Sequence, residues 1–117
     1  METNIDYIYN TTFVLENETK VSKWLTQAVK KEGFSVGEVV YAFFNDEDLK
    51  LLNSKHLNHD YFTDVISFND SKGTVLNGNI AISIDRVREN AERYKTSFNN
   101  ELLRVMVHGL LHFMGYN

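Results

Sequence analysis

The sequence predicts a single domain, residues 1–117, that combines about four β-strands with about four α-helices. Its length of 117 residues suits one domain with a real core and is too short for two. Its composition is that of an ordinary globular protein, because 43% of the residues are hydrophobic and 13% are aromatic. Along the chain, some segments have the periodicity of strands and others have the periodicity of helices.

The composition also limits the chemistry of this chain. It contains no cysteine, which excludes disulfides and thiolate ligands, so a bound metal would need nitrogen and oxygen ligands. The formal net charge of −4 counts modestly against nucleic acid as a partner, although a local basic patch or a bound cation could override it. The amino terminus lacks a signal-peptide pattern, and no apolar run approaches the ~20 residues that span a bilayer. We therefore expect a cytoplasmic protein with no membrane segment.

The first half of the chain predicts two strands and two helices. Residues 4–9 alternate in polarity and suit a strand. Thr19 is placed to cap a helix, which ends near Gly33. The apolar stripe of this helix comprises Val21, Trp24, Leu25, Ala28 and Val29. Residues 38–44 predict a buried strand, and Asn45 then caps a helix with an acidic first turn. The pattern continues that helix to His56 or Leu57, and a loop is expected at residues 56–62.

The second half predicts two more strands and two more helices. Residues 63–68 and 79–84 have strand patterns and could pair as an antiparallel hairpin. Asp85 is placed to cap the third helix. The apolar stripe of that helix comprises Val87, Ala91 and Tyr94. Asn99 or Asn100 is placed to cap the last helix.

The last helix differs from the others because apolar residues fill nearly all of its positions. Such a helix is expected to be central and buried. Its only polar stripe consists of Arg104, His108 and His112, at successive steps of four residues. Polar groups on a buried helix need partners, since each unpaired one costs ~1–3 kcal/mol. This stripe is therefore the first candidate for a functional site.

His108 and His112 project from the same face of this helix, so both imidazoles can bind one metal ion. The alternative is a pair of core histidines that hydrogen-bond to backbone or carboxylate groups. A catalytic zinc site takes three protein ligands, and the third could come from just beyond Asn117. Gly109 stands where zinc peptidases carry a glutamate base, which argues against peptidase chemistry.

Other polar residues are weaker candidates. Asp64 is either an ordinary residue at the start of a strand or part of a groove beside the last helix. Asn79 either closes a turn or belongs to the same groove, and Ser67 is a further candidate for it. His56 and His59 are expected to be exposed histidines of a loop.

Three segments carry a resemblance to a known family: TDVISF at 63–68, GNIAIS at 78–83 and VHGLLHFMGYN at 107–117. Together they resemble the YbeY family of bacterial ribosomal RNA maturation factors, which are metal-dependent endoribonucleases. The resemblance extends from about Leu52 to the end of the chain. In the last segment the matching residues are His108, Gly109, Leu111, His112, Gly115 and Tyr116.

The resemblance implies an α+β fold with a mixed sheet of about four strands packed by about four helices. It implies one zinc ion held by three histidines, and cleavage of single-stranded RNA in ribosomal RNA processing, with ribosomal proteins as candidate partners. His108 and His112 match the first two ligands, and the third falls directly after Asn117. Family members continue for a few dozen residues, so we expect this chain to lack the family's carboxyl-terminal tail.

Several positions depart from the family pattern. Leu57 stands where the family often has an arginine associated with substrate phosphate, and Phe62 replaces a proline. Lys55 or Arg104 could compensate for the missing arginine. Two aspartates of the family are replaced by asparagines, at Asn79 and Asn117.

We therefore expect a zinc-dependent endoribonuclease of ribosomal RNA maturation. Zinc would polarise a phosphoryl oxygen or activate its bound water, while a groove between the sheet and the last helix positions the RNA strand. The candidate substrate-binding residues are Asp64, Ser67, Asn79 and Arg104. Two alternatives remain open: a metal-dependent hydrolase of another substrate, and a non-catalytic, ribosome-associated binding protein in which the histidines are structural.

Overall fold

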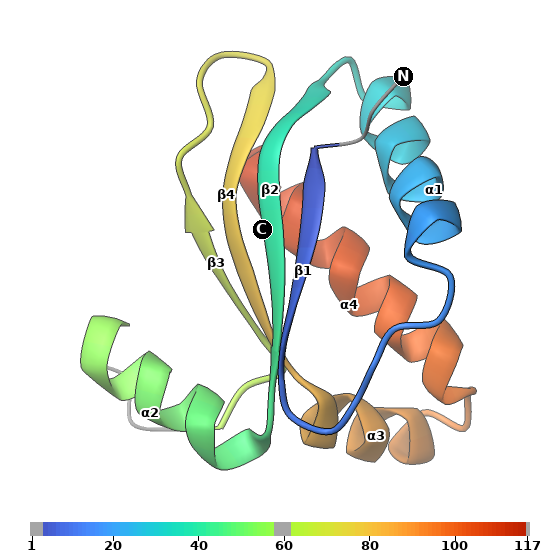
Figure 1. The fold of residues 1–117 in the computed structure, drawn as a ribbon, viewed down its shortest axis with the longest axis vertical. Helices are drawn as coiled ribbons and strands as arrows, with labels where there is room; N and C mark the ends of the chain where they lie inside the picture. The colour runs from blue at the N-terminus through green and yellow to red at the C-terminus, as the bar shows by residue number, and fades with distance from the viewer. Residues whose placement is uncertain (1–3, 58–61, 117) are drawn as a thin grey trace.

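The computed structural model describes residues 4–57 and 62–116, which form four strands and four helices (Figure 1). The strands are β1 (Ile5–Asn10), β2 (Ser35–Phe44), β3 (Val65–Asn69) and β4 (Val75–Ser83). The helices are α1 (Glu18–Lys31), α2 (Asp46–Leu57), α3 (Ile84–Arg93) and α4 (Phe98–Phe113). The α+β class expected from the sequence is confirmed.

All four strands form one sheet in the order β1–β2–β4–β3. The pairs β1–β2 and β2–β4 are parallel, whereas β3 and β4 are antiparallel. The sheet is therefore mixed, and the hairpin predicted for β3 and β4 is confirmed. In this hairpin Ser67 lies opposite Ile80, and Phe68 lies opposite Asn79.

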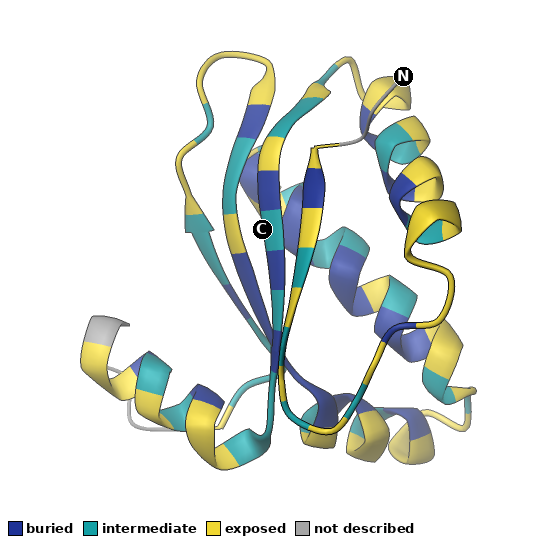
Figure 2. Ribbon diagram, in the orientation of Figure 1, coloured by how far each residue is buried: buried dark blue, intermediate teal, exposed yellow. Residues whose placement is uncertain are grey.

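The two faces of the sheet are covered differently. Helices α1 and α4 lie against one face (Figure 1), and the main core forms there around fully buried side chains such as Tyr41. On the other face α2 closes one end, where Leu49 packs with Ile66 and Ala81. Further along that face the surface is more open, and Ile8 of β1 is 49% exposed (Figure 2). Alternation of side chains along each strand separates the two sets of residues.

Helix α1 begins earlier than predicted. It follows Asn17, not Thr19, and Asn17 has a left-handed backbone (φ 58°) with no hydrogen bond from its side chain to the helix end. Ser22 is buried in the interface with the sheet, whereas Trp24 is 44% exposed. Tyr94 was predicted to complete the apolar stripe of α3, but it is 61% exposed. Tyr94 follows the end of α3 at Arg93 as its C-cap residue, so it does not extend the buried face of that helix.

Two further predicted helix caps are wrong, and serines take their place. The Ser83 hydroxyl caps α3 by accepting a backbone N–H bond at 3.1 Å, so Asp85 lies inside the first turn. The Ser97 hydroxyl caps α4 in the same way, also at 3.1 Å, ahead of Asn99 and Asn100. Serine, asparagine and aspartate are about equally good helix caps. The residue that caps each helix therefore depends on where the preceding segment ends.

Helix α2 begins and ends as its apolar pattern predicts, so the loop expected from residue 56 starts later. Asn45 caps it, since its side-chain oxygen accepts the backbone N–H of Asp48 at 2.8 Å. The helix continues to Leu57, so His56 belongs to α2 and not to a loop. The expectation that His56 and His59 are exposed lies outside what the structure describes, as does the side chain of Leu57.

Helix α4 is not buried on all sides. One side packs on the sheet through Leu102, Val105, Met106, Gly109, Leu110 and Phe113. The other side carries Arg104 and His112, which are exposed, and the remaining apolar residues between the two sides are half-buried (Figure 2). Helix α4 is therefore buried on the side that meets the sheet, and the expectation that it is a central helix stays a prediction. Within the described residues, no helix has the length and apolarity that crossing a membrane requires.

Candidate functional site

His108 and His112 lie next to each other on α4. Their ring centroids are 4.4 Å apart and the ring planes meet at 63°. They meet because residues four apart share one face of an α-helix. His108 is half-buried and His112 is exposed, so the pair is open to solvent. The adjacency of the two imidazoles is confirmed, and metal binding stays a prediction.

The surroundings of His112 favour its neutral form. Desolvation and the neighbouring His108 lower the pKa of His112 below its ordinary value of 6.5, and the charge of Asp64 partly opposes this shift. A neutral imidazole is the form that binds a metal ion. At neutral pH His112 is therefore ready to act as a ligand without first losing a proton.

Within the described residues, the candidate ligands for a zinc ion are His108 and His112. Neither residues 4–57 nor 62–116 contribute a group of three or more His, Asp, Glu or Cys side chains arranged around one point. The two imidazoles of α4 are nitrogen donors of the kind that zinc prefers. They fit two of the three protein ligands of a catalytic site, and the ligand expected directly after Asn117 stays a prediction.

Asp64 lies between α3 and the polar side of α4. Its carboxylate accepts a hydrogen bond from the side-chain amide of Asn90 at 3.2 Å. Its backbone carbonyl accepts the N–H of Ser83 at 2.9 Å, which ties the start of β3 to the end of β4. The same carboxylate acts on the pKa of His112, as described above. The structure therefore brings Asp64 towards the histidine pair.

Arg104 is held by an acidic residue that sequence reasoning missed. Its Nε and Nη2 donate to the two carboxylate oxygens of Glu101 at 2.9 and 2.7 Å. The Glu101 side chain is 2% exposed, so Arg104 neutralises a buried charge. These hydrogen bonds raise the pKa of Arg104, and the charges of Glu101 and Asp64 raise it further against the effect of desolvation. The available signal was the spacing of three residues between Glu101 and Arg104.

Ser67 lies beneath α4 where the helix approaches the sheet most closely. Its hydroxyl donates to the carbonyl of Gly109 over 3.5 Å, a long hydrogen bond. A Cβ atom on Gly109 would lie 2.7 Å from Cγ2 of Ile80, so the helix can sit here only with a glycine. This gives Gly109 a structural role, and it excludes the glutamate of zinc peptidases on steric grounds as well.

Asn79 lies on the opposite face of the sheet from the histidines. Ile80 and Ile82 of β4 belong to the core beneath α4, whereas Ala81 belongs to the cluster beneath α2, and Asn79 shares the face of Ala81. There it borders a cavity of about 430 Å³ lined by Glu38, Val40, Asp70, Lys72, Asn77, Gly78 and Asn79. The expectation that Asn79 joins a groove between the sheet and the last helix is wrong. Successive residues of a strand point to opposite faces, so a shift of one residue exchanges the face.

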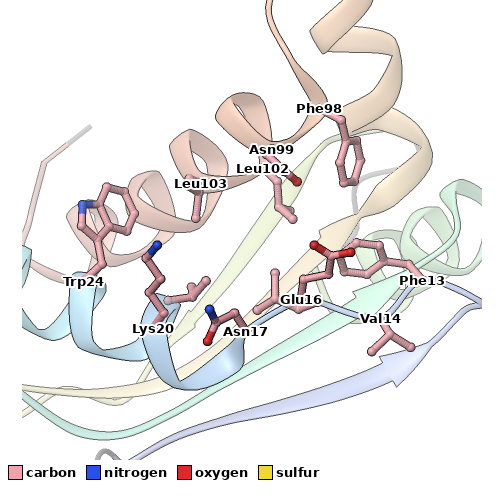
Figure 3. Close-up of a pocket in the computed structure, with 12 residues that line it drawn as sticks. Phe13, Val14, Glu16, Asn17, Lys20, Trp24, Phe98, Asn99, Leu102 and Leu103 are labelled. Atoms are coloured by element: carbon pink, nitrogen blue, oxygen red, sulfur yellow. The ribbon is translucent and has the colours of Figure 1, made fainter.

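A second cavity, of about 580 Å³, lies between the segment that precedes α1 and the start of α4 (Figure 3). Its lining is mainly apolar, and Trp24 and Phe98 mark its two ends in Figure 3. It borders the amino-terminal end of α4, whereas His108 and His112 lie near the carboxyl-terminal end. This cavity is therefore separate from the candidate site.

Comparison with known proteins extends the match beyond the histidine motif. A family model described as Endoribonuclease YbeY matches residues 6–117. The proteins named Endoribonuclease YbeY from Flavobacterium psychrophilum and Flavobacterium johnsoniae are 46% and 42% identical over 112 residues, covering 96% of this chain and 80% and 81% of theirs. The solution structure of TM1509 from Thermotoga maritima has a TM-score of 0.65 and 27% identity, covering 97% of this chain and 73% of that one. With both halves of its sequence matched, this chain belongs to the YbeY family.

Proposed function

We propose that this protein is a zinc-dependent endoribonuclease that cleaves single-stranded RNA during ribosomal RNA maturation. The observation that carries the proposal is the adjacent pair His108 and His112, 4.4 Å apart between centroids, in a chain of the endoribonuclease YbeY family. A cytoplasmic location and contact with ribosomal proteins follow from this role and are part of the same proposal.

In this proposal His108 and His112 hold the zinc ion together with a third ligand expected directly after Asn117. When bound, zinc supplies a Lewis acid that polarises a phosphoryl oxygen and lowers the pKa of a bound water. The chain itself provides the geometry, because the close contact of Gly109 with Ile80 fixes the helix that carries both imidazoles. Asp64, held by Asn90, adds a negative charge that favours a cation near His112.

The test measures metal content and RNA cleavage with purified full-length protein. We expect about one zinc ion per chain, cleavage of a single-stranded RNA oligonucleotide, loss of cleavage with a chelator and recovery when zinc is returned. His112→Ala should lose both zinc and cleavage. Gln27→Ala is the control, because Gln27 is exposed on α1 and distant in the sequence from both histidines. This variant should keep both the zinc and the cleavage activity.

The results separate the proposal from its two rivals. Bound zinc with intact RNA would indicate a metal-dependent hydrolase of another substrate. A protein without metal or turnover would be a ribosome-associated binding protein, for which the net charge of −4 gives some support over an RNA-cutting enzyme. Cleavage that is unchanged in His112→Ala would overturn the proposal.

A further inference from the structure

Arg104 belongs to the same row of side chains on α4 as the two histidines. It lies four residues before His108, which itself lies four residues before His112. Residues four apart share one face of an α-helix, and four residues rise about 6 Å along its axis. The three side chains therefore follow one another along α4, with Arg104 at the amino-terminal end of the row.

One side of the Arg104 guanidinium is held by a buried carboxylate. Its Nε and Nη2 atoms donate to the two oxygens of Glu101 at 2.9 and 2.7 Å. The Glu101 side chain is 2% exposed, whereas that of Arg104 is 54% exposed. A guanidinium has five N–H bonds in one plane, and this carboxylate uses two of them. The edge formed by Nη1 and Nη2 is therefore left over, on a side chain that is open to solvent.

Two exposed arginines of α3 are held less firmly. Nη1 of Arg88 lies 3.8 Å from the carboxylate of Asp85, and Nη2 of Arg93 lies 3.4 Å from that of Glu89. Exposed ion pairs of this kind are weak, because holding two long side chains in one geometry costs entropy. A buried carboxylate instead needs its partner, since a charge left alone in the interior is costly. Glu101 thus gives its arginine a fixed orientation that the arginines of these exposed pairs lack.

We propose that Arg104 binds a phosphate of the RNA substrate through its Nη1–Nη2 edge, and that Glu101 is the positioning residue that aims this edge. The planar fork of arginine matches two oxygens of one phosphate, and such charge-assisted hydrogen bonds are stronger than neutral ones. About one helical turn separates Arg104 from His108, so the phosphate bound would be a neighbour of the scissile one. The inference rests on the proposed function, since the strand is the one that the histidine pair would cut.

The Glu101–Arg104 pair is neutral as a unit, and this makes the proposed contact distinctive. A surface that attracts RNA by charge alone needs an excess of cations, whereas the net charge of this chain is −4. A neutral pair instead binds through N–H bonds whose direction is set in advance. Removing the charge of Glu101 would therefore strengthen RNA binding if charge alone acted, and would weaken it if positioning matters.

Steady-state kinetics of the zinc-loaded, full-length protein on a single-stranded RNA oligonucleotide test the contact. Arg104→Met should raise KM about tenfold and change kcat by less than about twofold, since the contact would be made equally in the bound substrate and in the transition state. The slope of log KM against log salt should fall by about 0.7, the value for one phosphate contact of a single strand. Arg88→Met is the matched control, because its side chain is 57% exposed and lies over the ring of Phe98. This control should change neither KM nor the slope.

Two variants test the positioning role. Glu101→Gln keeps the size of the side chain but weakens its hold on the guanidinium, so KM should rise about threefold. Arg104→Lys keeps the charge but loses the planar fork, so KM should stay about fivefold or more above that of the unmodified protein. A role in stability alone would lower the thermal midpoint of both variants and leave KM and its salt dependence unchanged.

The outcomes keep this inference separate from the proposed function. If the unmodified protein cleaves RNA but Arg104→Met has an unchanged KM and an unchanged salt slope, the phosphate contact is wrong and the nuclease stands. A lower KM in Glu101→Gln overturns the positioning role, because Arg104 then acts only through its charge.

Two further cases are decided by the same set of variants. If Arg104→Met does not fold, Arg104→Lys decides, since it keeps an ion pair with Glu101: a raised KM supports the contact, and an unchanged KM overturns it. If the unmodified protein binds RNA without cutting it, the proposed function fails, and the fluorescence anisotropy of labelled RNA makes the same comparison with Kd in place of KM. If the unmodified protein neither binds nor cuts RNA, both proposals fail.

Discussion

On the side of α4 that meets the sheet, side chains are fully buried and the backbone comes so close that position 109 must be glycine. On the solvent side of the same helix, Arg104 and His112 are exposed and His108 is half-buried. The first side fixes where the helix lies, and the second presents the groups that could bind metal and substrate. Substitutions on the sheet side should therefore change stability, whereas substitutions on the solvent side should change chemistry.

The largest effect should come from the solvent side. His112→Ala should reduce RNA cleavage by about a thousandfold or more, since a catalytic metal contributes several kcal/mol to transition-state stabilisation. Because the side chain is exposed, the midpoint of thermal unfolding measured without metal should stay within about 2 °C of the unmodified protein. A much lower midpoint would mean that the two sides are not independent.

The next effect should come from the sheet side. Gly109→Val should lower the free energy of unfolding by about 3 kcal/mol, because the new side chain would collide with the fully buried Ile80. Urea denaturation measures this loss. Gln27→Val is the matched control, since it places the same β-branched residue on an exposed helix face and should cost less than about 1 kcal/mol. Equal losses in the two variants would show that the helix has room to move away from the sheet.

The contrast between the sides also explains what the sequence could predict. The pairing of His108 with His112 depends on helix geometry alone, so the spacing of four residues was sufficient. The periodicities that distinguish strands from helices are likewise local, and all eight described elements were predicted. Alternation along β4 already puts Asn79 on the opposite face from Ile80 and Ile82, but which of the two faces meets α4 depends on tertiary contacts, and the placement of Asn79 was wrong for that reason.

Residues whose role depends on packing were the ones missed. Glu101 looks like an ordinary acidic residue in a first helical turn, yet it is buried and bound to Arg104. The apolar positions of α4 suggested a central, buried helix, and the sequence does not say that only one side of this helix meets the sheet. Trp24 was predicted to lie in the apolar stripe of α1, yet it is 44% exposed, because burial of a helix residue depends on the elements that pack against it.

Between the two sides lies the Arg104–Glu101 pair, and breaking it should cost an intermediate amount. Arg104→Met keeps the length of the side chain but leaves the buried Glu101 carboxylate without its partner, so we expect a loss of about 2 kcal/mol in urea denaturation. The double variant Glu101→Gln/Arg104→Met removes the stranded charge and should recover part of that loss. If the double variant is no more stable than Arg104→Met, the unpaired carboxylate of Glu101 does not explain the loss of stability.

The smallest effect should come from a hydrogen bond that joins β2 to the middle of α4. The Tyr41 hydroxyl, which is fully buried, donates to the backbone carbonyl of Met106 at 2.8 Å. Tyr41→Phe should lower the free energy of unfolding by about 1 kcal/mol, because the carbonyl keeps its helical partner four residues on. RNA cleavage below the unfolding transition should be unchanged. A fall in kcat with no such loss of stability would mean that this bond sets the position of the histidines themselves, two residues along the same helix, and the division between the two sides of α4 would then fail.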